Sequence, residues 1–297
     1  MPINIRTVSR EDYLLPGHAA CPGCPESIGL KIIGKAFKGK AILVIPASCS
    51  SIIQGPYPRS AIRMPLLNIA FAASAAAASG IAAALEILGK TDVQVVVWAG
   101  DGGTADIGIQ ALSGAAERND NIIFVCDDNE AYMNTGIQRS GATPYGAWTT
   151  TTWTGKKEFK KDVPMIVAAH RVPYVATASI GYPLDFMEKL IKASKIKGFK
   201  YIHLLSPCPV GWRFPPEKTI EMGRLAVLTG MWPLYEIEYG KFKLTGPSRA
   251  LIDKSKRIPV EKYIKMQGRF KHLKDKDIKR LQEYVDKQWE EIKKLVG

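Results

Sequence analysis

The residues best suited to chemistry by type and spacing are the five cysteines: Cys21, Cys24, Cys49, Cys126 and Cys208. Cys21 and Cys24 form a Cys-Pro-Gly-Cys motif, which in a reducing cytoplasm indicates metal or redox chemistry rather than a disulfide. Cys49 and Cys208 each follow a short apolar run, so both are expected in loops at the ends of strands. Cys126 lies inside an apolar run and is predicted to be a buried residue that takes no part in the site.

Four thiols therefore remain for one site, which fits the ligands of an iron–sulfur cluster or of a structural zinc ion. Ligand type alone does not separate the two, because tetrahedral thiolate sites take either metal. A thioredoxin-like dithiol would sit at the start of a helix that follows a strand, whereas this motif precedes the first convincing strand. Free thiols without a metal are the remaining alternative.

A glycine-rich turn with one carboxylate, Gly100-Asp101-Gly102-Gly103-Thr104, stands between an apolar strand and a helix. Glycines let a backbone approach a phosphate, and the N-terminus of a helix favours its charge. Asp101 suits a Mg²⁺ ion that bridges two phosphates, because magnesium prefers oxygen ligands and few protein carboxylates. The alternative is a tight turn in which Asp101 only caps the helix.

A second polar cluster, at residues 127–136, follows the next apolar run. Neighbouring parallel strands end at the same edge of a sheet, so Asp101, an amide oxygen and a backbone carbonyl would complete a magnesium shell. Asn134 and Thr135 would reach phosphate oxygens. The chain has no GxGxxG fingerprint and no Walker A lysine, so neither a Rossmann dinucleotide site nor a P-loop is predicted.

Strand-like apolar runs alternate with helical patterns over most of the chain, which is the βαβ rhythm of a parallel sheet. Strands are predicted near residues 41–46, 93–99, 121–126, 174–179 and 201–205, with helices near 66–88, 104–118 and 184–195. The strands lack polar alternation, as expected where helices cover both faces. The predicted fold class is therefore α/β, a parallel sheet with helices on both faces.

Two further segments have unusual composition. Residues 135–164 are rich in Gly, Thr and Trp and have no helical or strand period, and a loop this long is usually functional. Residues 275–296 carry one apolar stripe on a charged helix, which predicts packing on this domain or on another subunit. We therefore divide the chain into a cofactor-binding domain with the cysteines, 1–246, and a C-terminal extension with a helical arm, 247–297.

Composition excludes several classes of protein. At 297 residues and 46% hydrophobic content, the chain can bury a full core and is neither disordered nor fibrous. The N-terminus has no apolar stretch of signal-peptide length, which predicts a cytoplasmic protein. Residues 66–88 are mainly Ala, Ser and Gly, so a tightly packed interior helix is favoured over a membrane span. The net charge of +13 comes without a nucleic-acid-binding signature and indicates a solvated surface or an acidic partner.

The motifs GHAACPGC, GPYP, GDGGTADIG, NEAYMNTGIQ and PCPVGW occur in this order along the chain. Together they resemble one family, the β subunits of archaeal and bacterial 2-oxoacid:ferredoxin oxidoreductases. The resemblance implies a thiamine-diphosphate-binding fold and a [4Fe-4S] cluster held by Cys21, Cys24, Cys49 and Cys208. It also implies Mg²⁺ held by Asp101, Asn129 and the Ala131 carbonyl. The cofactor contacts that it implies are Ser48, Gly100, Gly102, Gly103, Thr104, Asn134 and Thr135.

The resemblance further implies an activity and partners. Members of the family oxidatively decarboxylate a 2-oxoacid, pass the acyl group to coenzyme A and send electrons through the cluster to ferredoxin. They assemble with α, γ and δ subunits, and the glutamate that activates thiamine comes from the α subunit. Pyruvate is the favoured substrate here, with 2-oxoisovalerate and oxalate as alternatives. Asn134 is the candidate catalytic residue near the reacting carbon.

This chain departs from the family's pattern at two places. Members commonly carry Glu-Asn where this chain reads Ala72-Ala73, and Gly is usual where Pro25-Glu26 follows the second cysteine. Both departures leave the cofactor-binding role in place and bear on the identity of the substrate. A protein of another class stays open as well, a zinc-stabilised scaffold subunit that binds a nucleotide at residues 100–104.

Overall fold

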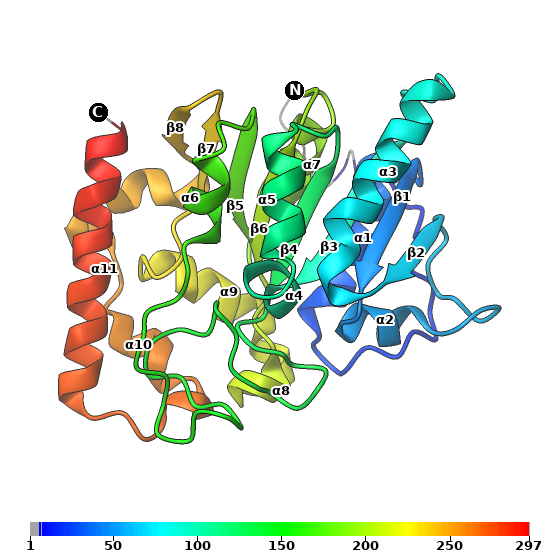
Figure 1. Ribbon diagram of the computed structural model, residues 1–297. Helices are drawn as coiled ribbons and strands as arrows, with labels where there is room; N and C mark the ends of the chain where they lie inside the picture. Colours follow the sequence, from blue (N-terminus) through cyan, green and yellow to red (C-terminus); the bar gives the residue numbers. More distant parts are fainter. Residues whose placement is uncertain (1–5, 7, 297) are drawn as a thin grey trace.

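An eight-stranded sheet with the strand order β2-β1-β3-β4-β6-β5-β7-β8 forms the centre of the molecule (Figure 1). The computed structural model describes residues 6 and 8–296. The strands are β1 (Ala41–Pro46), β2 (Leu66–Ile69), β3 (Gln94–Gly100), β4 (Ile123–Asp128), β5 (Tyr174–Ser179), β6 (Lys200–Leu205), β7 (Tyr235–Glu238) and β8 (Lys241–Leu244). The predicted strands are all present, and β1 to β6 pair in parallel. The α/β prediction is confirmed.

Helices cover both faces of the sheet. They are α1 (Pro25–Phe37), α2 (Cys49–Gln54), α3 (Ser74–Ile87), α4 (Asp101–Ala105), α5 (Ile109–Glu117), α6 (Val163–Ala168), α7 (Pro183–Ala193), α8 (Pro209–Trp212), α9 (Thr219–Leu228), α10 (Val260–Lys265) and α11 (Asp275–Val296). Helices α1 and α7 pack on Val96 and Trp98, whereas α3, α5 and α6 share a core with Val95 and Val97 on the opposite face. Because successive strand residues point to opposite faces, β3 supplies both cores.

Strands β7 and β8 add an antiparallel hairpin at one edge, which the sequence analysis missed. Each strand has only four residues, and half of the β7 side chains are only partly buried. The turn residues Tyr239 and Gly240 both have positive φ, 46° and 79°, as a type I′ hairpin requires. Runs this short carry too few residues to show a period.

The prediction of a single interior helix at residues 66–88 is wrong. The segment divides into β2, a 3₁₀ turn at Phe71–Ala73 and α3, and only Ser74, Ala75 and Ala78 of α3 are buried. The helix packs on β3 and α5 along one side, so Ile87 at its end is 87% exposed. None of the helices within the described residues is both long enough and apolar enough to cross a membrane.

The helix predicted near residues 104–118 is broken into α4 and α5. The break falls at Asp106, whose carboxylate accepts hydrogen bonds from Tyr132 Oη and Lys161 Nζ at 3.1 and 3.0 Å. It also accepts from the Gly141 backbone N–H at 3.0 Å. These contacts hold Asp106 in a non-helical conformation and tie the turn to the long loop.

The segment after residue 246 packs on the body of the same chain. Leu281, Val285, Trp289 and Ile292 form the buried stripe of α11 and belong to the core that contains α5 and α6. The apolar stripe predicted for this helix thus packs on this domain. The division into 1–246 and 247–297 stays a prediction, and within the described residues the two segments share one core.

Trp289 offers a test of this packing. Its ring is completely buried, and its Nε1 donates to the Gly230 carbonyl at 2.9 Å. We expect Trp289→Ala to lower the free energy of unfolding by about 3–5 kcal/mol, because it leaves a cavity and an unpaired carbonyl. Leu295→Ala, at a side chain 48% exposed on the same helix, is the control and should cost under about 0.5 kcal/mol. Urea unfolding followed by circular dichroism measures both, and equal losses would contradict the assigned packing.

Candidate cofactor and metal site

Asp101 lies where β3 ends and α4 begins, beside the end of β4. Its side chain is completely buried. The carboxylate oxygen Oδ2 accepts a hydrogen bond from the Ser140 hydroxyl, whereas Oδ1 has no partner among the described residues. Burial and then the nearby Asp128 carboxylate raise the pKa of Asp101 well above its usual value. A cation at the free oxygen would relieve this cost.

The loop after β4 presents a second unpaired oxygen. Asn129 Nδ2 donates to Glu26 Oε1 at 3.3 Å, while Asn129 Oδ1 is buried and has no hydrogen-bond partner within the described part of the chain. The Asn129 carbonyl accepts from Trp212 Nε1 at 2.8 Å. Glu130 then adopts a φ of 66°, a left-handed conformation that non-glycine residues rarely take. Surrounding contacts must therefore hold this turn.

A buried network of charges, formed by Asp128, Glu130, Lys160, His203 and Arg269, holds the turn. Glu130 accepts from Arg269 Nη2 at 2.6 Å and from Lys160 Nζ at 3.1 Å. Asp128 Oδ2 lies 3.1 Å from Lys160 Nζ and 2.8 Å from His203 Nε2. Burial would raise the pKa of Asp128, but Lys160 and His203 lower it to about 2. The two carboxylates are thus balanced by Lys160 and Arg269.

Asn129 and the two glycines on either side of Asp101 line a hollow of about 340 Å³, called the cofactor hollow below. The predicted residues that line it are Ser48, Gly100, Gly102, Gly103, Asn129, Ala131, Asn134 and Thr135. Two predicted contacts, Asp101 and Thr104, are not among the lining residues: the Asp101 side chain is completely buried, and the Thr104 hydroxyl donates to the Gly100 carbonyl at 2.9 Å. A Cβ atom at position 102 would collide with the Tyr132 ring, so only glycine fits there.

Cysteines from three separate segments approach the cofactor hollow. Cys49 lines it and begins α2, while Cys24 and Cys208 stand directly before α1 and α8. Burial raises the pKa of Cys49, and the Cys208 and Cys24 thiols raise it further. Burial also raises the pKa of Cys208 to about 11, with a contribution from Cys21. Cys126, in contrast, is fully buried in the core.

No set of three or more His, Cys, Asp or Glu side chains in the described residues is arranged to hold a single metal ion. The zinc-stabilised scaffold therefore finds no support in the structure.

His18, three residues before Cys21, accepts a hydrogen bond from the Ala20 N–H at 3.3 Å and holds its own turn.

Several lining residues were not assigned from the sequence. Glu26, Phe71, Tyr132 and Met133 all line the cofactor hollow. Glu26 is part of one departure from the family's pattern, and Phe71 directly precedes the other. These departures were the signal in the sequence that could have pointed to both residues. Lys160 was missed because it lies in a lysine-rich stretch that reads as solvated surface.

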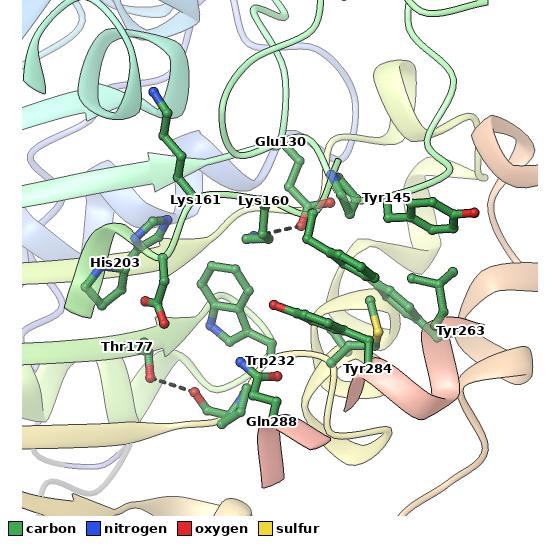
Figure 2. A pocket seen from close by; sticks show the side chains of 18 of the residues that line it. Glu130, Tyr145, Lys160, Lys161, Thr177, His203, Trp232, Tyr263, Tyr284 and Gln288 are labelled. Atoms are coloured by element: carbon green, nitrogen blue, oxygen red, sulfur yellow. Dashed lines mark hydrogen bonds and ion pairs between the residues drawn. The ribbon is translucent and has the colours of Figure 1, made fainter. Parts of the chain in front are cut away.

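A larger hollow of about 830 Å³ is bordered by Glu130, Lys160 and His203 of the network (Figure 2). Figure 2 shows the rings of Trp232, Tyr263 and Tyr284 around it, with the Lys160 amine turned toward Glu130. The Lys160 side chain is 23% exposed there. An uncharged side chain of similar length can therefore replace Lys160 without collision.

Residues 47–204 match the family described as thiamine pyrophosphate enzyme, C-terminal TPP binding domain. The chain is thus a thiamine-diphosphate-binding protein by class. Its fold is similar to that of a 2-oxoglutarate:ferredoxin oxidoreductase from Magnetococcus marinus, with a TM-score of 0.57 and 23% identity. That likeness covers 73% of this chain and 78% of the other.

Two relatives match along almost their whole length. The chain is 51% identical to ketoisovalerate oxidoreductase subunit VorB of Pyrococcus furiosus, over 99% of this chain and 98% of that protein. It is 52% identical to pyruvate synthase subunit PorB of Methanothermobacter thermautotrophicus, over 96% of this chain and 99% of that protein. The chain therefore belongs to the family of β subunits of 2-oxoacid:ferredoxin oxidoreductases, and the predicted resemblance is confirmed.

Removal of the Lys160 charge tests the role of the network. We expect Lys160→Met to lower the free energy of unfolding by about 3–5 kcal/mol, because it leaves two buried carboxylates short of one cation. Lys157→Met, at an exposed lysine of the same loop, is the matched control and should cost under about 0.5 kcal/mol. Chemical unfolding of both variants measures the difference. A similar small loss in both would mean that the network contributes little to stability.

Proposed function

We propose that the cofactor hollow binds Mg²⁺ and the diphosphate of thiamine diphosphate. The observation that carries this proposal is the pair of buried, unpaired oxygens, Asp101 Oδ1 and Asn129 Oδ1. A buried polar atom without a partner is costly, and Mg²⁺ prefers such oxygen ligands. The Ala131 carbonyl, on the same loop, is the third proposed protein ligand. The backbone of Gly100, Gly102 and Gly103 can approach the phosphate oxygens closely.

We further propose that Cys21, Cys24, Cys49 and Cys208 hold a [4Fe-4S] cluster. The four thiols form the Cys₄ donor set of such a cluster. The Gly211 N–H already donates to Cys208 Sγ at 3.4 Å, and a hydrogen bond of this kind stabilises a metal-bound thiolate. Cys49 lines the cofactor hollow, so it would bring the cluster next to thiamine.

Thiamine diphosphate, when bound, supplies a carbon nucleophile and an electron sink for a 2-oxoacid. The residues of this chain hold it and control its surroundings. Phe71 and Met133 give the hollow an apolar side, which excludes water. Asn134 is exposed at the wall, where its amide can donate a hydrogen bond to oxygen atoms of the substrate. We therefore keep Asn134 as the proposed catalytic residue.

One relative is named as a subunit of a ketoisovalerate oxidoreductase and the other as a subunit of a pyruvate synthase, which supports a function within a complex of several chains. We propose α, γ and δ subunits as partners, ferredoxin as the electron acceptor and coenzyme A as the acyl acceptor. We also propose a cytoplasmic location, with no part for nucleic acid or a membrane. The glutamate that activates thiamine is assigned to the α subunit.

Pyruvate is the proposed substrate and 2-oxoisovalerate is the second candidate. A pyruvate synthase subunit, PorB of Methanothermobacter thermautotrophicus, is 52% identical, which supports the first. Pyrococcus furiosus has both kinds of subunit, and this chain is 51% identical to its VorB but 43% identical to its PorB. That difference favours 2-oxoisovalerate. The substrate pocket includes other chains, so only a measurement on the whole complex decides between the two acids.

A pair of variants tests the cofactor assignment. The anaerobically purified complex should hold about four iron and four sulfide per β chain, in addition to thiamine diphosphate and Mg²⁺. We expect Cys49→Ala to lose most of the cluster iron and Asp101→Ala to lose thiamine diphosphate and Mg²⁺. Cys126→Ala removes a buried thiol outside the proposed set and should keep all four groups. Zinc in place of iron, or no thiamine in the wild type, would overturn the proposal.

Substrate preference is tested by ferredoxin reduction in the presence of coenzyme A. We expect kcat/KM for pyruvate to exceed that for 2-oxoisovalerate by about 10-fold or more, because a pocket shaped for a methyl group excludes an isopropyl group. 2-Oxoglutarate serves as the control for a charged side chain. A reversed order would replace pyruvate with 2-oxoisovalerate and leave the cofactor assignment intact.

A further inference from the structure

Glu26 is a carboxylic acid in an unusual place. It stands in the first turn of α1, two residues after Cys24, and is only 4% exposed. It lines the cofactor hollow, and no basic side chain is among its hydrogen-bond partners. A carboxyl group is costly to bury without a cation, so its retention at this point needs a reason beyond the packing of α1.

The two oxygens of Glu26 hold two different groups. Oε1 accepts from Asn129 Nδ2 at 3.3 Å, across a sequence separation of 103 residues. Oε2 accepts from Ser50 Oγ at 2.6 Å, and Ser50 Oγ in turn accepts from Trp98 Nε1 at 2.7 Å. Glu26 therefore joins the loop after β4 to the start of α2.

On the first side, the hydrogen bond fixes the orientation of an amide. With Nδ2 bound to Glu26, Asn129 Oδ1 is left as the free polar atom of this side chain. If the amide were reversed, the donor would replace the acceptor, and a cation would meet an NH₂ group.

On the second side, the hydrogen bond fixes the segment that carries a cysteine. Ser50 directly follows Cys49, and its hydroxyl is completely buried between Glu26 and Trp98. Glu26 also lies within interaction distance of the Cys49 thiol and the Asp127 carboxyl. The position of Cys49 at the start of α2 thus depends on the same carboxyl group.

We propose that Glu26 is a positioning residue that connects the two cofactor sites: through Asn129 it orients the metal-binding amide, and through Ser50 it places Cys49 toward the other cysteines. This inference rests on the proposed function. It predicts that one substitution at position 26 disturbs both Mg²⁺ affinity and the cluster, although Glu26 is a ligand of neither.

The test uses the assembled complex, purified anaerobically, with the variants Glu26→Ala, Glu26→Gln and Ser50→Ala. Glu221→Ala, at an exposed glutamate of α9, is the control. The first readout is the dissociation constant of Mg²⁺ with thiamine diphosphate in excess, measured by calorimetry after removal of metal. The second is the electron paramagnetic resonance spectrum of the reduced cluster, with iron content. A thermal midpoint for each variant separates these effects from unfolding.

Loss of a hydrogen bond that orients a metal ligand commonly costs 10–100-fold in affinity, so Glu26→Ala should weaken Mg²⁺ binding by about that factor. It should also change the cluster spectrum. Glu26→Gln keeps an acceptor for Asn129 and should bind Mg²⁺ close to the wild-type value. Ser50→Ala should change the spectrum but leave Mg²⁺ affinity nearly unchanged, because the contact between Glu26 and Asn129 remains.

Wild-type Mg²⁺ affinity and an unchanged spectrum in Glu26→Ala would overturn the inference. So would an equal loss of affinity in Glu26→Gln and Glu26→Ala, since the hydrogen bond would then not be the cause. If Glu26→Ala fails to assemble, a loss of Mg²⁺ affinity in Glu26→Gln or an unchanged cluster spectrum in Ser50→Ala would overturn the inference. A wild-type complex without thiamine, Mg²⁺ and iron would instead reject the proposed function itself.

Discussion

The balance of buried charge around Asp128 and Glu130 is the constraint on which the site depends. Two carboxylates in the interior are tolerated only because Lys160 and Arg269 lie within hydrogen-bond distance of them. The left-handed turn at Glu130 is kept by the same contacts, and this turn presents Asn129 and Ala131 to the cofactor hollow. The cations come from the long loop and from the C-terminal extension. Both segments are therefore part of the site, although Lys160 and Arg269 themselves do not line the cofactor hollow.

A second regularity is that each of the two side chains proposed to bind Mg²⁺ uses one polar atom in a hydrogen bond to the protein and leaves the other free. Ser140 occupies Asp101 Oδ2, and Glu26 occupies the Asn129 amide nitrogen. Ser140 is itself held in place, since Lys156 Nζ donates to the carbonyls of Ser140, Gly141 and Thr143 at 3.3, 3.2 and 2.6 Å. Burial, and then the Arg139 charge, lower the pKa of Lys156 to about 8. The long loop thus fixes the orientation of Asp101 from a distance of 39 residues along the chain.

The parts of this site that the sequence predicts are those that follow from local pattern. Gly100 to Gly103, Asn129 and Cys49 stand directly after apolar runs, and parallel strands bring such positions to one edge. Glu26 and Lys160 could not be found in this way, because their roles depend on partners 103 and 32 residues away. Thr104 was assigned through its place in a motif, although its hydroxyl is used within α4. The error at residues 66–88 has a similar cause, since an Ala-rich composition does not say which side of a helix is covered.

The cofactor hollow differs from the rest of the molecule in its charge. The chain has a net charge of +13, yet none of the described residues that line the hollow is Lys or Arg. Its ionisable carboxyl group, Glu26, lies on the same side as Cys49, and Phe71 and Tyr132 pack edge to face on the wall. A diphosphate placed here meets glycine backbone instead of a cationic side chain. If Mg²⁺ binds at Asp101 and Asn129 as proposed, the ion would supply the balancing positive charge, and cofactor binding would depend on the metal more than it would in a lysine-lined phosphate site.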